Sequence, residues 1–172
     1  MKKNIVLASV IGSLMIMSGV AQASDGTVKF IGNIVDTACK VDSGSADQSV
    51  VLGTVASSSF SKAGDASSAQ KFDIKLTDCP TGTVAVVFGG SSVTDDLLQL
   101  DSGMTATGVA VRINNADDFS QVKINDTASA KRVTVAADGS ATLKYVGQYQ
   151  ATAATVGAGT ANATSQFTVL YN

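Results

Sequence analysis

The sequence predicts an all-β fold, an antiparallel sandwich of short strands, and three observations support it. Val, Thr and Ser supply 21, 17 and 20 of the 172 residues while Glu is absent, a composition that favours strands joined by polar turns over amphipathic helices. Apolar and polar residues alternate along many short segments. Gly, Ser, Asp and Asn separate these segments, and this spacing indicates an antiparallel sandwich rather than β-α-β units.

Ahead of the strands, residues 1–23 are predicted to be a signal peptide. Lys2 and Lys3 give a positive start, an apolar run follows, and small residues precede the expected cleavage site after Ala23. A membrane anchor is the alternative, but the apolar run of about 16 residues is shorter than the roughly 20 that a spanning helix needs. We therefore expect an exported mature chain that begins at Ser24.

The predicted strands follow from alternation or from short apolar runs. In chain order they occupy residues 28–34, 50–55, 72–76, 84–88, 109–113, 121–124, 132–135, 142–149 and 166–171. Asp138 and Gly139 predict a hairpin turn between the strands at 132–135 and 142–149. The Ala- and Ser-rich segment 56–69 is either a loop or one short helical turn.

The first and last predicted strands are unusual for their positions near the ends of the mature chain. The first could pair within its own domain or lie free to pair elsewhere. The last alternates Phe167, Val169 and Tyr171 almost to the final residue. Terminal residues usually fray, so a terminus with the pattern of a core strand is expected to be held by other groups.

The residue inventory argues against catalysis. The chain has no His and no Glu, so it lacks an imidazole base or metal ligand, and two Cys cannot form a four-thiolate zinc site. The Asp95-Asp96 and Asp117-Asp118 pairs lack the spacing of a calcium loop and are interpreted as solvated turns. We therefore expect no enzyme, no catalytic or metal site, and no cofactor.

Charge and cysteine content describe an acidic, disulfide-bonded chain. The full chain has 12 Lys and Arg residues against 14 Asp residues, and without Lys2 and Lys3 the mature net charge is −4. No basic cluster is available to neutralise phosphates, so nucleic acid is not an expected partner. Because export leads to an oxidising compartment, the only two cysteines, Cys39 and Cys79, are expected to form one disulfide.

Four segments together carry a family resemblance. They are residues 26–39 (GTVKFIGNIVDTAC), 47–55 (DQSVVLGTV), 72–79 (FDIKLTDC) and 167–172 (FTVLYN). In this order, behind a signal peptide, they resemble a major-type (type 1-like) fimbrial subunit of the chaperone/usher pilin family. The resemblance covers essentially all of the mature chain. Gly159, fourteenth from the carboxyl end, and Tyr171, next to last, match the family's C-terminal pattern.

The resemblance implies an incomplete immunoglobulin-like sandwich that is completed by a donor strand from another subunit. Residues 24–36 would be the N-terminal donor-strand extension and residues 37–172 the pilin domain. The donor strand would direct one set of alternate residues into a neighbour's groove: Val28, Phe30, Gly32 and Ile34. The chaperone-binding C-terminal strand would use Gly159, Phe167, Val169 and Tyr171.

The resemblance further implies a structural subunit of a bacterial surface fimbria that supports cell adhesion. The subunit would be exported through the periplasm, carried by a periplasmic chaperone to an outer-membrane usher, and polymerised by donor-strand exchange. Its partners would be the chaperone, the usher and neighbouring copies of itself in a head-to-tail filament. The alternatives are a minor fimbrial subunit or a glycan-binding adhesin, although the tip adhesins of the family generally carry a separate receptor domain, for which this chain has no room.

Overall fold

The computed structural model describes residues 26–32 and 38–171 of the chain, and each of these two parts is considered by itself. The predicted signal peptide and Ile34 lie outside the described residues. None of residues 26–32 belongs to a helix or strand. The folded unit therefore begins, in the described part of the chain, at residue 38.

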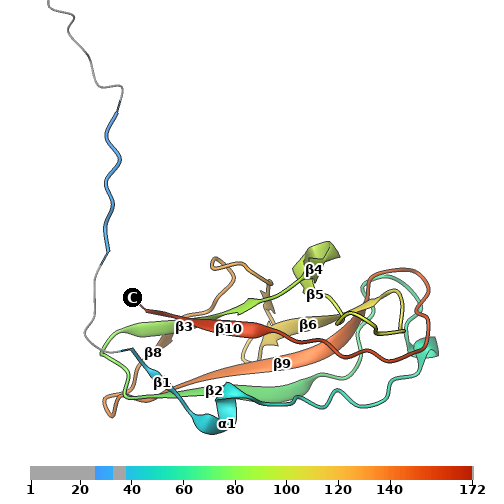
Figure 1. Ribbon diagram of the computed structural model, residues 1–172, viewed down its shortest axis with the longest axis horizontal. Coiled ribbons are helices and arrows are strands. Elements are labelled where there is room, and N and C mark those ends of the chain that lie inside the picture. The colour runs from blue at the N-terminus through green and yellow to red at the C-terminus, as the bar shows by residue number, and fades with distance from the viewer. Residues whose placement is uncertain (1–25, 33–37, 172) are drawn as a thin grey trace, which may run out of the picture. The chain divides into compact units, whose positions relative to one another are not determined.

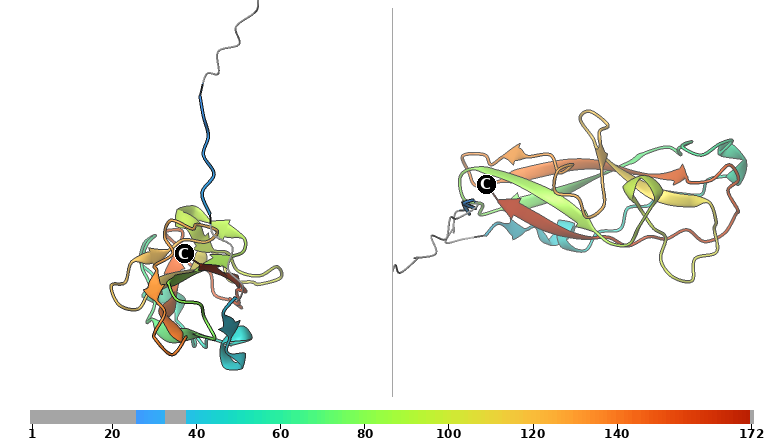
Figure 2. Two further views of the ribbon diagram at one scale, coloured as in Figure 1. Left: turned by 90° about the vertical axis from the view of Figure 1, so that its left-hand side faces the viewer. Right: turned by 90° about the horizontal axis from the view of Figure 1, so that it is seen from above.

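The strands among residues 38–171 form two sheets, a larger and a smaller one (Figures 1 and 2). The larger sheet contains β1 (Lys40–Val41), β2 (Gln70–Thr77), β4 (Ser92–Val93), β5 (Leu97–Leu98), β6 (Val109–Asn115), β7 (Gln121–Val122) and β9 (Ala141–Ala151). Its order is β1-β2-β9-β6-β5-β4, with β7 also paired to β6. The smaller sheet contains β3 (Thr83–Gly89), β8 (Val133–Thr134) and β10 (Gln166–Tyr171), in the order β10-β3-β8.

Helical structure is limited to three short pieces in the described residues. They are α1 (Ser43–Ala46), η1 (Ser57–Ser59) and η2 (Thr94–Asp96). The segment 56–69 thus contains one short helical turn within a loop, one of the two forms expected for it. None of the helices in the described part of the chain is long and apolar enough to cross a membrane.

The core lies between the two sheets and consists mainly of aliphatic side chains from alternate strand positions. Strand β9 is the longest, and it pairs antiparallel with β2 along one edge and with β6 along the other. Its Leu143 and Tyr145 face the core opposite Val84 and Val86 of β3, and all four are almost fully buried. Because side chains alternate across a strand, this face is the buried one in each sheet.

The all-β prediction is confirmed, and the architecture is consistent with an immunoglobulin-like sandwich. The predicted strands at 72–76, 84–88, 109–113 and 142–149 lie within β2, β3, β6 and β9, and that at 166–171 coincides with β10. Those at 121–124 and 132–135 correspond to the two-residue strands β7 and β8. Strands β1, β4 and β5 were not predicted, because two residues are too short to show alternation.

Within residues 38–171, one prediction of secondary structure is wrong and another is correct only locally. Residues 50–55 form no strand, because none of their backbone groups forms a hydrogen bond with another described residue. The run is apolar because Leu52 packs against the core. The turn at Asp138-Gly139 is closed locally as a hairpin, since the Gly139 amide donates to the Ala136 carbonyl at 2.9 Å and the Ala136 amide donates to the Ser140 carbonyl at 2.8 Å, but it does not join two strands of one sheet. The strands on either side of it, β8 and β9, belong to different sheets.

The predicted disulfide between Cys39 and Cys79 is present. It ties the start of the folded unit to Cys79, two residues after β2, beside the β1–β2 pair formed by Lys40 and Thr77. The Cys39 amide also donates a hydrogen bond to the Tyr171 hydroxyl oxygen, with 3.1 Å between nitrogen and oxygen. The beginning of the domain is therefore fixed both to β2 and to the carboxyl end of β10.

The acidic pair Asp117-Asp118 lies in the turn between β6 and β7, as expected for a solvated turn. Asp118 accepts hydrogen bonds from the Ser120 hydroxyl at 2.7 Å and the Ser120 amide at 3.0 Å. The Lys131 ammonium lies 3.2 Å from the same carboxylate. These groups, the Ser120 hydroxyl foremost, lower the pKa of Asp118 from 3.8 to about 2. The Asp118 carboxylate therefore stays charged at acidic pH, and it keeps its hydrogen bonds to Ser120 across the turn there.

Removing the disulfide should destabilise the domain. In a variant with Cys39→Ala and Cys79→Ala, loss of a crosslink that closes a loop of about 40 residues is expected to lower the free energy of unfolding by about 4 kcal/mol. Guanidinium unfolding of the oxidised parent and the variant measures the difference. Addition of reductant should destabilise the parent by a similar amount and leave the variant unchanged. Equal stability of the oxidised parent and the variant would contradict the prediction.

The hydrogen bonds to Asp118 should make stability depend on pH. Because its pKa is lowered on folding, its stabilising contribution is complete above the ordinary value of 3.8 and is lost as the pH falls through about 2. An Asp118→Asn variant should therefore melt below the parent at pH 7, and the two melting temperatures should converge in acid. Melting curves from pH 7 down to about pH 2 test this. Asp47→Asn, on another exposed loop, is the control, and a gap independent of pH would contradict the prediction.

Candidate functional site

An open groove of about 890 Å³ runs along one side of the sandwich, at the margin between the two sheets. One rim is formed by residues 45–54, which include the end of α1 and the segment after it. The other rim is formed by residues 161–165 and Phe167, which lead into and begin β10. Figure 1 shows these rims as the chain that follows α1 and the chain that leads into β10.

The floor of the groove is apolar and includes much of the chain's aromatic content. It is lined from both sheets by Phe72, Ile74, Phe88, Leu98, Val111, Ile113, Gly147 and Tyr149. The rings of Phe72 and Phe88 lie 6.0 Å apart, and that of Phe167 lies 6.5 Å from Phe88. Buried Tyr145 completes this cluster from below, with its ring 5.0 Å from that of Phe88. Asp47 is the one carboxylate among the lining residues described, so the groove suits an apolar occupant.

Both rims offer backbone groups that have no strand partner in the described part of the chain. Strand β10 is the end strand of its sheet and pairs with β3 along one edge only. Across the groove, the backbone groups of residues 50–55 form no hydrogen bond with another described residue. Unpaired N–H and C=O groups beside apolar side chains are a template for the addition of another strand.

The rim before β10 is held by side chains rather than by a strand ladder. The Asp101 carboxylate accepts hydrogen bonds from the Thr164 amide at 2.9 Å and the Thr164 hydroxyl at 2.8 Å. The Tyr149 hydroxyl donates to the Ala161 carbonyl at 2.9 Å, and burial raises the pKa of this phenol. The groove therefore keeps a fixed opening although no strand spans it.

Of the four residues predicted for the C-terminal strand, three lie on β10 and one lies outside it. Phe167, Val169 and Tyr171 lie on β10, half-buried with their side chains against the core. Gly159 lies outside β10, in the loop before it, which corrects its assignment to the strand. A Cβ at Gly159 would overlap backbone atoms of Thr105 and Ala106, so this position requires glycine for close packing of two loops.

Of the predicted donor residues, Val28, Phe30 and Gly32 lie in the described residues 26–32. Val28 and Phe30 are 78% and 91% exposed. Gly32 has open space around it, because a Cβ added there would meet no atom within 4 Å. The rim residues 45–54 and 161–165 were missed as site residues. The sequence carried a signal only for the first rim, in the apolar run at 50–55.

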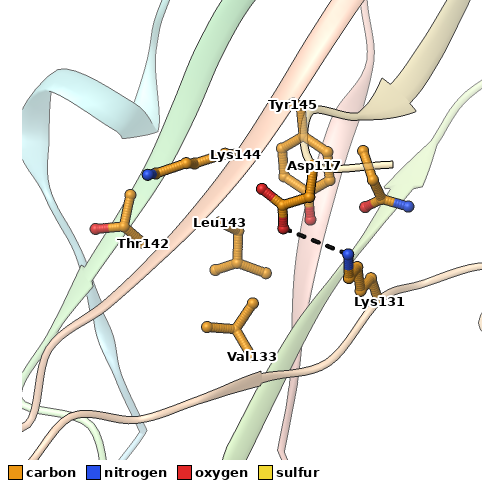
Figure 3. A pocket seen from close by; sticks show the side chains of 8 residues that line it. Asp117, Lys131, Val133, Thr142, Leu143, Lys144 and Tyr145 are labelled. Atoms are coloured by element: carbon orange, nitrogen blue, oxygen red, sulfur yellow. Dashed lines mark hydrogen bonds and ion pairs between the residues drawn. The ribbon is translucent and has the colours of Figure 1, made fainter. Parts of the chain in front are cut away.

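A smaller cavity of about 210 Å³ lies near the turn between β6 and β7 (Figure 3). The Lys131 ammonium lies 3.3 Å from the Asp117 carboxylate in its wall, so these charges neutralise each other. Burial raises the pKa of Tyr145, so its phenol stays protonated. Within residues 26–32 and 38–171, no group of three or more Cys or Asp side chains is placed to hold a metal ion. Neither cavity presents a nucleophile beside a base.

Comparison with known proteins identifies the family. The model of the fimbrial protein family matches residues 28–172. The type-1 fimbrial protein subunit of Serratia marcescens is 39% identical over 162 aligned residues, which cover 88% of this chain and 89% of that protein. The family resemblance seen in the sequence is thereby confirmed.

Solved structures agree with this assignment. The P pilus rod subunit PapA is 26% identical, with a TM-score of 0.62, over 79% of this chain and all of the other. A chaperone-usher pilus whose structure addresses rod uncoiling is 28% identical, with a TM-score of 0.59, over 87% of this chain and 96% of the other. The chain therefore belongs to the fimbrial protein family, whose members are structural subunits and not enzymes.

Proposed function

We propose that the chain is a structural subunit of a bacterial surface fimbria and that its copies join by donor-strand exchange. Residues 24–36 of one subunit would fill the groove of the next. The observation that carries this proposal is the groove itself, with an apolar floor between two rims whose backbone groups lack a strand partner among the described residues. A strand laid between the rims would satisfy both and complete the sandwich.

The energetics favour an apolar strand as the occupant. Val28, Phe30 and Ile34 share one parity of the extension, so they would point together into the groove. Burying these three side chains would contribute on the order of 5 to 9 kcal/mol before the cost of ordering the strand. Gly32 shares this parity and would lie where the groove is shallow. Hydrogen bonds to both rims would add to the stability of the joint.

The direction of the donor strand favours a second copy over the chain's own extension. Cys39 is hydrogen-bonded to Tyr171 at the carboxyl end of β10. An extension that folded back directly into its own groove would enter at that end and run parallel to β10. A strand from another copy is free to run antiparallel to β10, and antiparallel pairing is the more stable per residue. Because this contact is head to tail and does not close on itself, it would produce an open filament.

A subunit with an open groove needs protection before assembly. Its unpaired rims beside an apolar groove would promote aggregation. We infer that a periplasmic chaperone lends a strand against β10, where Phe167, Val169 and Tyr171 fix the edge, and delivers the subunit to an outer-membrane usher. Similarity to a chaperone-usher pilus and to a rod subunit supports this route and a position in the fimbrial rod. The assembled fimbria would lie outside the cell and support adhesion.

Deletion of residues 24–36 tests the proposal. The truncated chain, produced with its chaperone and usher, should still form a chaperone complex but no fibres, because it accepts a strand without donating one. Electron microscopy and denaturation-resistant ladders on gels measure assembly. A full-length variant with Thr27→Ser, on the outward parity, is the control and should form fibres. Long fibres from the truncated chain would show that donor-strand exchange is wrong.

Substitution of Gly32 tests the fit inside the groove. In the free chain an added Cβ meets nothing within 4 Å, so Gly32→Val should leave folding and the chaperone complex unchanged. In a neighbour's groove the added side chain would overpack, at a cost of about 1–3 kcal/mol, and slow assembly about tenfold. The rate of fibre formation measures the effect. Thr27→Val places the same side chain on the outward parity and should assemble normally. Equal rates of fibre formation for Gly32→Val and Thr27→Val would count against a shallow groove at Gly32.

A further inference from the structure

The outward face of the extension carries an apolar residue that groove filling does not use. In the described part of the chain, the exposed large apolar side chains are Val28, Phe30, Ile31, Val51 and Phe119. The first two lie on the parity proposed to enter the groove. Ile31 is 83% exposed and lies on the opposite parity, so in an inserted strand it would point away from the core.

The rim of the groove carries a matching residue. Val51 is 78% exposed, whereas its neighbours Val50 and Leu52 are half-buried and Leu52 packs against the core. Val51 therefore points outward from the rim, on the same side of the sandwich to which Ile31 would point. Each is a β-branched side chain, and such pairs stabilise adjacent strands when they lie side by side.

We infer that Ile31 of one subunit contacts Val51 of the next on the outer face of the joint between them. The partner is a second copy of this chain, and the inference rests on the proposed donor-strand exchange. Adjacent strands lie about 4.8 Å apart, so outward side chains at the same level of two neighbouring strands are in contact. The contact would cover the hydrogen bonds between extension and rim and shield them from water.

Charge complementarity favours one direction and register. The rim leads away from the Cys39 end of the domain, whereas β10 ends there beside Cys39. A donor strand antiparallel to β10 therefore runs parallel to the rim. With Ile31 beside Val51, Lys29 would then lie beside Ser49, within reach of the exposed Asp47 carboxylate. In the opposite direction Lys29 would lie beside Gly53, where the rim offers no acidic side chain.

The contact would also help to set the register of the joint. A slip by one residue turns every side chain of a strand to the other face. It would expose Phe30 and force Lys29 and Ile31 into the groove. A slip by two residues keeps the groove-facing parity but separates Ile31 from Val51. The outward pair therefore distinguishes registers that the alternation alone does not.

Introducing charged side chains at the two positions tests the inference in fibres of the full-length mature chain. Ile31→Lys alone and Val51→Asp alone should each speed the dissociation of fibres in guanidinium chloride by roughly fivefold, the upper range for a cross-strand pair. In Ile31→Lys combined with Val51→Asp, the opposite charges should restore much of that loss. Gel analysis of released subunits against time gives the rates. If the effects of the double variant simply multiply those of the singles, the two side chains do not meet.

Two controls separate this contact from general effects of charge and from the proposed function. Phe119→Lys replaces an exposed apolar residue in the turn between β6 and β7 and should leave dissociation unchanged. If the charged variants fail to assemble, Ile31→Thr, Val51→Thr and the variant with both changes allow the same comparison of single and double substitutions with milder changes. Unchanged dissociation in these variants, while deletion of residues 24–36 abolishes fibres, would overturn the contact and leave donor-strand exchange intact.

A cysteine crosslink gives a direct geometric readout. In fibres of a variant with Ile31→Cys and Val51→Cys, oxidation should join successive subunits and give a covalent ladder on non-reducing gels, because disulfides require Cα atoms about 4.4–6.8 Å apart. Ile31→Cys with Phe119→Cys is the matched control and should give no ladder, since Phe119 is exposed in the turn between β6 and β7 and does not line the groove. Intact fibres without a ladder in the first variant would overturn the inference.

Discussion

The unpaired edge of β10 is the constraint on which the rest of this structure depends. A strand edge with unpaired N–H and C=O groups is a template for pairing, and in the described part of the chain β10 has strand partners on the β3 side alone. The rim at residues 50–55 has the same deficit across the groove. An apolar floor between two unpaired rims is a template for the addition of another strand, and the proposed donor strand would fill it.

The rest of the domain holds the two rims of the groove in place, although no strand of the described residues lies between them. The disulfide between Cys39 and Cys79 fixes the start of the domain to β2, and the Tyr171 hydroxyl fixes the same point to the end of β10. Side chains such as Asp101 hold the far rim open. The aromatic cluster around Phe88 joins the two sheets beneath the groove. Rigidity on all sides of the gap would reduce the entropy lost when a strand enters.

Strand prediction succeeded where the local pattern and the tertiary environment agreed. Long strands with one buried face, such as β2 and β9, showed clear alternation, and the two cysteines allowed one pairing. Prediction failed at residues 50–55, whose apolar run reflects packing of Leu52 and not a ladder. At Asp138-Gly139 the local hairpin turn was correct, but a turn signal does not say whether its flanking strands share a sheet. Gly159 was linked to the last strand, although its role is close packing against Thr105 and Ala106.

The sequence by itself determined the all-β class, the disulfide, the absence of His-based catalysis and the family, because composition, parity and short motifs are local properties. Only the tertiary structure decided where the groove lies, since its two rims are more than a hundred residues apart along the chain. It also decided which apolar residues remain exposed: Ile31 and Val51 look like core residues in sequence, and only the fold turns Val51 outward. Burial depends on which segments meet in space, and local pattern does not encode that.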